Sequence, residues 1–182
     1  MRWWLESAAI RELRRGRVIA QATEGVFGLG CRAFDQGACA RLAALKGRAK
    51  NKRFIVVVAD FAQISRALHP QGTALEEVLA SWPGPETWVF PVAPAAPRWL
   101  RGEDRTIAVR VTAHRQLARI CAAVGPIVST SANPPGRKPA LNLARVRGYF
   151  GREVDFYLAG DLITPGRATR IRDARSGLLL RR

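Results

Sequence analysis

Residues 46–58 read Lys-Gly-Arg-Ala-Lys-Asn-Lys-Arg-Phe-Ile-Val-Val-Val, so a basic segment runs directly into an apolar one. The apolar half, from Phe54 to Ala59, is uninterrupted and mostly β-branched, which is typical of a strand covered on both faces. The basic half carries five cations and no carboxylate. Because crowded cations repel one another, we expect an anion with several oxygens, such as a phosphate-rich ligand, to bind among them.

The regions on either side of this strand alternate between helical and extended patterns. Apolar residues at helical spacing predict helices at residues 5–13, 34–45, 60–68, 74–81, 115–123 and 143–150. Short apolar runs predict strands at residues 18–20, 87–90, 107–111 and 126–129, and around Phe156, Ile171 and Leu179. We therefore expect residues 1–182 to form a single α/β domain with an open, twisted, mixed β-sheet flanked by helices.

The balance of charge is the unusual feature of the composition. The 182 residues include 30 Lys and Arg against 14 Asp and Glu, which gives a formal net charge of +16. An excess of this size favours polyanionic partners, either nucleotides or RNA. An Arg-rich and Ala-rich composition can also reflect genome bias, so the charge alone leaves both interpretations open.

Cysteine, histidine and hydropathy patterns narrow the class of protein. Three cysteines, Cys31, Cys39 and Cys121, lie in apolar or Ala-rich surroundings, which is typical of reduced core thiols. With only two histidines and no Cys-x-x-Cys pair, we expect no zinc or other metal site. No apolar run is long enough to span a bilayer and the first residues lack a signal-peptide core, so we expect a cytoplasmic protein.

A glycine-rich segment, Thr23-Glu24-Gly25-Val26-Phe27-Gly28-Leu29-Gly30, follows the first predicted strand. It is either a ligand-binding loop or a tight turn that packs helix on sheet. The hydroxyl of Thr23 either binds a substrate carboxylate or caps that turn. Residues 28–33 are not a dinucleotide fingerprint, because no acidic residue between Asp35 and Asp60 could hold a ribose. The sequence also lacks a P-loop, so any nucleotide must bind by other means.

A second polar segment follows the strand predicted at residues 126–129. Residues 129–136 read Ser-Thr-Ser-Ala-Asn-Pro-Pro-Gly. Ser131 has neither the nucleophile elbow nor the histidine and acid that a serine nucleophile needs. Its hydroxyl and the amide of Asn133 therefore either bind a ligand or cap a turn. His114 is predicted to cap the helix that follows it.

Three cations stand out from the rest. Lys46 and Arg48, at the end of a predicted helix, could stabilise charge that develops on a phosphoryl group during adenylation. The alternative is a solvated helix terminus whose dipole favours positive charge. Arg110 ends a predicted strand where the sheet would favour an apolar residue. It either recognises a carboxylate or phosphate or forms an ion pair with Glu103 or Asp104.

Taken together, these segments resemble the YrdC-like family of threonylcarbamoyl-AMP synthases. The resemblance covers nearly the whole chain, because several motifs occur in the same order. They are Thr23-Glu24, Val26-Phe27-Gly28-Leu29-Gly30, Ala44-Leu45-Lys46-Gly47-Arg48 with Lys52, Trp82-Pro83-Gly84-Pro85 with Thr87, Ala108-Val109-Arg110-Val111, Ser129-Thr130-Ser131-Ala132-Asn133 and Ile171-Arg172-Asp173.

The resemblance implies an enzyme that makes threonylcarbamoyl-AMP and pyrophosphate from threonine, bicarbonate and ATP with Mg²⁺. It also implies partner proteins that pass the threonylcarbamoyl group to adenosine 37 of tRNAs reading codons that begin with A. The implied residues fall into three groups. They are Lys46, Arg48, Ser131 and Asn133 for catalysis, Lys52, Thr106, Thr169 and Arg181 for the nucleotide, and Thr23 and Arg110 for threonine.

Five positions depart from the family's pattern: Ala22, Gly25, Ala49, Arg53 and Arg170. These changes leave the charged and hydroxyl groups largely intact, so they bear more on the threonine pocket than on ATP chemistry. Two alternatives remain: a non-catalytic module of the same fold that binds double-stranded RNA or tRNA, and a related enzyme that uses carbamoyl phosphate.

Overall fold

The computed structural model describes residues 3–47, 54–70 and 75–181. Strands from all three ranges join in one nine-stranded sheet. In chain order they are β1 (Ile19–Ala22), β2 (Phe27–Arg32), β3 (Ile55–Val58), β4 (Glu86–Pro91), β5 (Thr106–Val111), β6 (Ile127–Ser131), β7 (Phe156–Tyr157), β8 (Arg170–Asp173) and β9 (Leu179–Arg181).

The sheet is mixed. Its strands lie in the order β7-β1-β2-β6-β3-β5-β4-β8-β9. The pairs β1–β7, β3–β5 and β4–β8 are parallel, and the remaining neighbours are antiparallel. The apolar run after the basic segment forms β3, between β6 and β5, so it is a central strand as its composition predicts. The predicted fold class, a mixed sheet flanked by helices, is confirmed.

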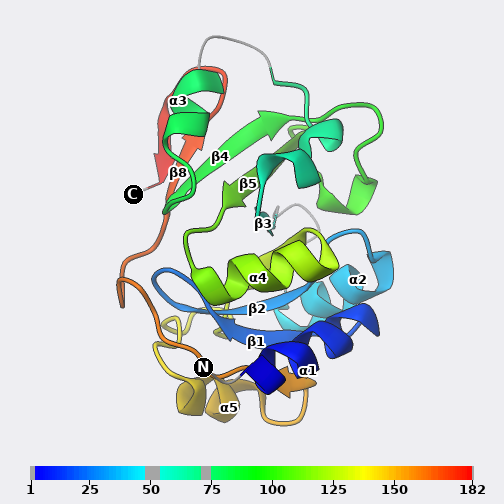
Figure 1. Cartoon of the computed structure of the whole chain (residues 1–182), viewed down its shortest axis with the longest axis vertical. Coiled ribbons are helices and arrows are strands. Elements are labelled where there is room, and N and C mark those ends of the chain that lie inside the picture. Colours follow the sequence, from blue (N-terminus) through cyan, green and yellow to red (C-terminus); the bar gives the residue numbers. More distant parts are fainter. Residues whose placement is uncertain (1–2, 48–53, 71–74, 182) are drawn as a thin grey trace.

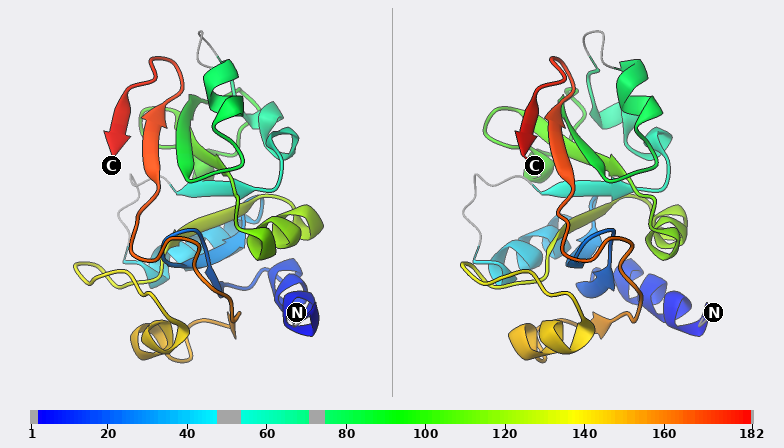
Figure 2. Two further views of the ribbon diagram at one scale, coloured as in Figure 1. Left: turned by 60° about the vertical axis from the view of Figure 1, so that its left-hand side comes forward. Right: turned by 90° about the vertical axis from the view of Figure 1, so that its left-hand side faces the viewer.

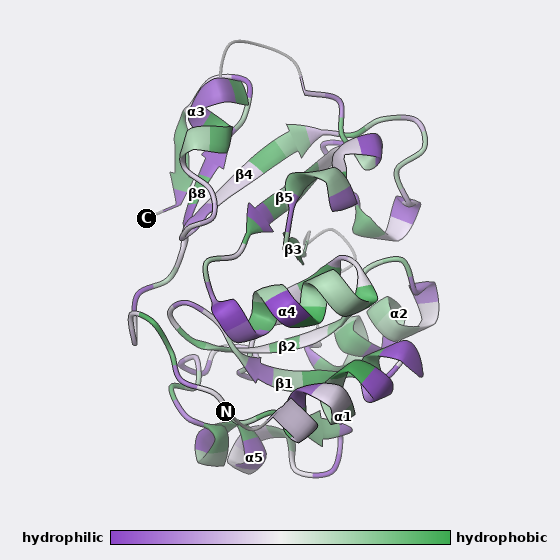
Figure 3. Cartoon of the chain, in the orientation of Figure 1, coloured by the Kyte–Doolittle hydropathy of each residue, from purple (hydrophilic) through white to green (hydrophobic). Residues whose placement is uncertain are grey.

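Helices cover both faces of the sheet (Figure 1). They are α1 (Trp3–Arg14), α2 (Gln36–Leu45), α3 (Leu75–Ala80), α4 (Arg115–Val124) and α5 (Leu143–Phe150). α1 and α4 lie side by side on one face, whereas α2, α3 and α5 bury side chains in the core on the other. Asp35 caps α2, and His114 caps α4 as predicted. In Figure 3, α4 carries both strongly polar and strongly apolar residues, as expected for a helix with one face on a sheet.

Alternation along the strands divides the core in two. On β3, Val56 and Val58 point into the larger core, while Val57 points into the smaller core beneath α1 and α4. Ile55 shares the face of Val57 but lies at the edge of that smaller core, where it lines a cavity. α1 and α4 therefore cover only part of their face, and the uncovered part is hollow.

Two predictions from the sequence were wrong. Residues 27–32 form strand β2 rather than a loop, with Phe27 and Leu29 in the larger core. Residues 60–68 form two short 3-10 segments, Phe61–Gln63 and Ser65–Ala67, rather than one helix. In the first of these, the carboxylate of Asp60 accepts a hydrogen bond from the backbone N–H of Ala62, which closes a tight turn.

The three cysteines are free and buried, as predicted. The sulfurs of Cys31 and Cys39 lie 3.9 Å apart, and burial raises the pKa of the Cys121 thiol to about 12. All three thiols pack in the interior. None of the helices in the described ranges is both long enough and apolar enough to cross a membrane.

Candidate active site

A cavity of about 760 Å³ opens on the part of the sheet that α4 leaves uncovered. β2, β3, β4, β5 and β6 contribute its floor, and residues 167–169 together with the C-terminal strand β9 contribute a wall. Gly28 on β2 faces the cavity, and its missing side chain keeps this part of the floor open because a Cβ would meet the Ser129 hydroxyl at 2.9 Å.

The charged side chains in the described lining of the cavity are all positive. Of the described residues that line the cavity, four are cationic and none is a carboxylate; the cations are Lys46, Arg110, Arg167 and Arg181. Cations gathered in a partly enclosed space repel one another unless an anion binds between them. The cavity is therefore suited to a ligand that carries several negative charges.

Lys46 joins two segments that are far apart in the sequence. It ends α2, and its ammonium donates hydrogen bonds to the backbone carbonyls of Ser131, at 2.7 Å, and of Asn133. The side-chain oxygen of Asn133 lies 3.5 Å from the same ammonium. The implied catalytic residues Lys46, Ser131 and Asn133 therefore come together, and these contacts fix a positive charge at the cavity wall.

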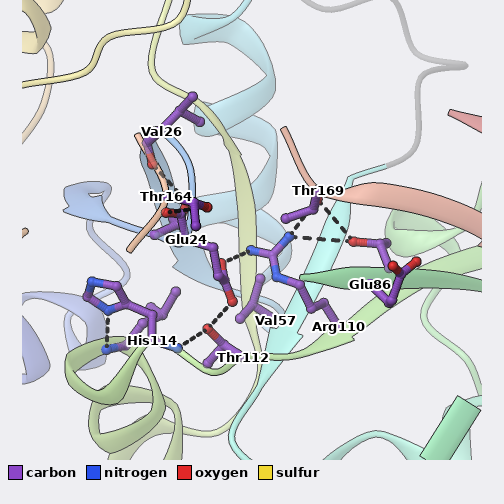
Figure 4. Close-up of polar contacts among 12 residues, drawn as sticks. Glu24, Val26, Val57, Glu86, Arg110, Thr112, His114, Thr164 and Thr169 are labelled. Carbon is purple, nitrogen blue, oxygen red and sulfur yellow. Dashed lines mark hydrogen bonds and ion pairs between the residues drawn. The ribbon is translucent and has the colours of Figure 1, made fainter. Parts of the chain in front are cut away.

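Arg110 lies inside β5 and is buried, with its side chain on the cavity face (Figure 4). Its guanidinium forms an ion pair with Glu24 at 3.0 Å and donates to the hydroxyl of Thr169 at 3.2 Å. The predicted alternative, an ion pair with Glu103 or Asp104, was wrong about the partner. Nε of Arg110 is buried without a hydrogen-bond partner among the described residues, which is unusual for a charged donor.

Glu24 is the residue that the sequence did not single out. Its carboxylate also accepts a hydrogen bond of 2.6 Å from the Thr112 hydroxyl, and Thr112 in turn accepts one from the backbone N–H of His114 (Figure 4). Glu24 lies behind the cavity lining and fixes Arg110 from the rear. An acidic residue in an otherwise apolar stretch was the signal that could have identified it.

Thr23 and Asn133 both line the cavity and both stabilise their own loops. Thr23 donates its hydroxyl hydrogen to the carbonyl of Val26 at 2.7 Å, which is the turn-capping alternative. The Asn133 amide donates to the carbonyls of Pro134 and Arg137. Each side chain therefore arrives at the cavity already oriented.

Thr169 and Arg181 also line the cavity, at its C-terminal wall. The Arg181 guanidinium donates to the carbonyl of Thr169 at 2.9 Å. Arg181 is exposed as a residue, yet partial burial of its guanidinium, and then the positive charge of Arg110, lower its pKa. A bound anion would relieve the repulsion between these two arginines.

One predicted residue that the structure describes, Thr106, does not line the cavity. Thr106 is buried and its hydroxyl donates to Asp104 at 2.8 Å, away from the lining. Arg48 and Lys52 lie outside the described residues. In the part of the chain that the structure describes, no group of three His, Cys, Asp or Glu side chains is arranged to hold a metal ion.

Comparison with known proteins identifies the family. The family model described as "Telomere recombination", of the Sua5, YciO and YrdC proteins, matches residues 11–182. The threonylcarbamoyl-AMP synthase of Halorhodospira halophila is 49% identical over 96% of this chain and 92% of its own length. The threonylcarbamoyl-AMP synthase of Nitrosococcus oceani is 46% identical over 98% of this chain and 97% of the relative's length.

Solved structures also resemble this chain. The crystal structure of P. abyssi Sua5 in complex with L-threonine matches with a TM-score of 0.85 and 30% identity. The match covers 95% of this chain, which spans about half (51%) of that protein. The crystal structure of E. coli YciO matches the whole chain with a TM-score of 0.85 at 23% identity, a likeness of fold alone.

Proposed function

The chain belongs to the Sua5/YciO/YrdC family, and we propose that it is a threonylcarbamoyl-AMP synthase. It converts L-threonine, bicarbonate and ATP into L-threonylcarbamoyladenylate and pyrophosphate, which makes it a nucleotidyltransferase. The observation that carries the proposal is the gathering of four cations around Ser131 and Asn133 in a single cavity. A triphosphate and an amino-acid carboxylate together supply the negative charge that this lining requires.

The reaction has two bond-forming steps. The amino nitrogen of threonine attacks the carbon of bicarbonate, and loss of water gives a carbamate. A carbamate oxygen then attacks the α-phosphorus of ATP, and the bond from that phosphorus to pyrophosphate breaks. Negative charge grows on the phosphoryl oxygens and on the leaving pyrophosphate, so fixed cations at these atoms lower the barrier.

Lys46 is assigned to the α-phosphate and carbamate. The backbone carbonyls of Ser131 and Asn133 already fix its ammonium. The lysine therefore loses little conformational freedom when the transition state forms. The Ser131 hydroxyl and the Asn133 side chain lie on the same segment and are assigned to the same oxygens. Arg48, two residues after Lys46, is assigned to the phosphates from the sequence pattern.

Arg110 is assigned to the carboxylate of threonine. Glu24 and Thr169 hold two edges of its guanidinium, which leaves Nε as the buried donor without a partner. A carboxylate at Nε would satisfy that donor with a charge-assisted hydrogen bond. Thr23 lines the same end of the cavity and is assigned to the amino acid as well.

Thr169 and Arg181 are assigned to the nucleotide, and so is Lys52 from the sequence pattern, whereas Thr106 lies away from the lining and receives no role. The described lining offers no carboxylate set for a metal site of its own. The residues therefore do not fit a resident Mg²⁺, and ATP is proposed to enter as its Mg²⁺ complex, as a substrate.

The product is proposed to serve the threonylcarbamoylation of adenosine 37 in tRNA, through partner proteins that take up the intermediate. We expect the protein to work in the cytoplasm, because ATP and tRNA are both present there. A non-catalytic RNA-binding module remains the second candidate because of the net charge of +16. The relative crystallised with L-threonine favours the synthase.

Product analysis by mass spectrometry tests the proposal. The purified chain should form threonylcarbamoyladenylate and pyrophosphate only when threonine, bicarbonate and ATP are all present. Lys46→Ala should lower kcat by about 100-fold or more, the usual loss when a charge-stabilising donor is removed. Tight, salt-sensitive RNA binding without ATP turnover would instead support the binding module.

Arg66→Ala is the matched control for Lys46→Ala. Arg66 is exposed in the second 3-10 segment and does not line the cavity, so its removal takes away the same unit of charge. Its activity should stay close to that of the unchanged chain. Equal losses in both variants would show that bulk charge, rather than the position of Lys46, supports turnover.

A further inference from the structure

Residues 164–169, which we call the strap, pass directly over the turn between β1 and β2. Figure 2 shows this segment in orange, running from β8 past the blue turn. The backbone N–H of Thr164 donates to the carbonyl of Glu24 at 2.7 Å, and that of Gly166 donates to the carbonyl of Gly25 at 2.8 Å. Two backbone amides at the start of the strap thus bond it to the two residues that precede Val26.

Gly25 is required here by space. A Cβ at position 25 would overlap the backbone carbonyl of Arg167. Gly25 is not among the glycines with a left-handed backbone, so a positive φ is not what requires glycine here. Because the obstacle is backbone rather than the end of a flexible side chain, a larger residue at position 25 must push the strap away.

The strap also connects this turn to the proposed threonine end of the cavity. Arg167, Ala168 and Thr169 line the cavity together with Gly25. Thr169 places its hydroxyl 3.2 Å from the Arg110 guanidinium, and its carbonyl accepts from Arg181. Moving the strap outward would therefore widen this end and take one hydrogen-bond partner from Arg110.

We infer that Gly25 is a specificity-determining residue: its missing side chain lets the strap close against the turn and form the wall that limits the amino acid to the size of threonine. The inference rests on the proposed function, because it assigns the wall to the amino-acid end of that same site. It predicts that position 25 acts on the recognition of threonine more than on the chemical step.

The test compares Gly25→Ala with Gly148→Ala. Gly148 lies in α5, where an added Cβ meets no atom within 4 Å, so this control adds the same methyl group in open space. Gly25→Ala should raise KM for threonine about tenfold while kcat falls less. It should also lose part of its preference for threonine over larger amino acids. Gly148→Ala should match the unchanged chain in all three quantities.

Hydrogen exchange of the strap amides supplies a readout that does not depend on turnover. The amides of Thr164 and Gly166 should exchange faster in Gly25→Ala, and threonine with ATP should slow their exchange in the unchanged chain. If Gly25→Ala does not fold, Gly166→Ala disturbs the strap from its own side, because Gly166 has φ +83° with open space around it. It should show the same rise in KM.

Two results distinguish the possible failures. An unchanged chain that makes no threonylcarbamoyladenylate contradicts the proposed function. An active chain whose Gly25→Ala variant folds, keeps the KM for threonine and keeps the strap amides protected overturns the role of Gly25 alone.

Discussion

Val57 and Arg110 are neighbours in the sheet, yet they belong to two different kinds of interior. They face each other across β3 and β5 in the parallel register, and both are buried (Figure 4). Val57 packs beneath α4 among apolar side chains such as Ile120 and Ile127. Arg110 lies in a network of an ion pair and hydroxyl groups at the cavity.

The difference between these two regions separates stability from function. In the apolar region, every contact lowers the free energy of the fold by removing hydrocarbon from water. In the cavity region, burying Arg110 and Glu24 costs solvation energy, and this cost can exceed the gain from their attraction. A fold keeps such a pair where a ligand uses it, so the charged region indicates the site and the apolar region holds the sheet that carries it.

The largest expected effect comes from breaking the charged region. Arg110→Met leaves the Glu24 carboxylate buried without its cation, which should lower the free energy of unfolding by about 3 kcal/mol or more. The loss of the guanidinium should also lower kcat/KM for threonine by about 100-fold, which corresponds to one charge-assisted hydrogen bond. Urea unfolding and steady-state kinetics with threonine as the varied substrate measure the two effects.

The double variant Arg110→Met/Glu24→Leu separates these effects. Replacing both charges with apolar groups removes the uncompensated carboxylate, so stability should return close to that of the unchanged chain. Activity should stay low, because Nε is still absent. A double variant as unstable as Arg110→Met would mean that the ion pair itself stabilises the fold.

The same contrast explains how much could be read from the sequence. β3 was predicted correctly because consecutive β-branched residues have few other places in a globular fold. β2 was missed because Gly28 and Gly30 weaken the strand signal, although Gly28 leaves room on the cavity side and Gly30 leaves room for the Gln21 side chain. In the apolar region local pattern and tertiary environment agree, whereas at the site they conflict.

The sequence predicted several residues that line the cavity, but not every contact that they make. Lys46, Ser131 and Asn133 carry recognisable motifs, and their meeting is present. The partner of Arg110 was sought among nearby acids, but it is Glu24, 86 positions earlier, because the turn after β1 reaches the same face of the sheet. Sequence distance says little about which buried charges meet.

The apolar region can be tested without disturbing the site. Val57 is fully buried and pairs with Arg110 across β3 and β5. Val57→Ala removes two methyl groups there, which should cost about 2 kcal/mol of stability. Its side chain points under α4, so KM for threonine and for ATP should remain unchanged. Thermal unfolding and steady-state kinetics check both statements. A raised KM would show that the two regions are mechanically coupled.

The smallest expected effect tests the outer edge of the apolar region. Glu6 on α1 forms an ion pair with Arg119 on α4 at 2.6 Å. The hydrogen bond from Arg119 lowers the pKa of Glu6, against the opposing effect of burial. Because the folded pKa is lowered, the pair stabilises the fold above the unfolded pKa of about 4.3 and loses this contribution as pH falls through the folded value.

Glu6→Gln should therefore lower the free energy of unfolding at pH 7 by less than about 1 kcal/mol, since the Arg119 side chain is 45% exposed and solvent screens the pair. The difference from the unchanged chain should shrink to zero in acid, where the carboxyl group is protonated and resembles the amide. Urea unfolding between pH 7 and pH 3 measures this difference. A difference in unfolding free energy that persists at pH 3 would mean that Glu6 acts through packing rather than charge. The contact between α1 and α4 would then be stabilised by apolar packing alone.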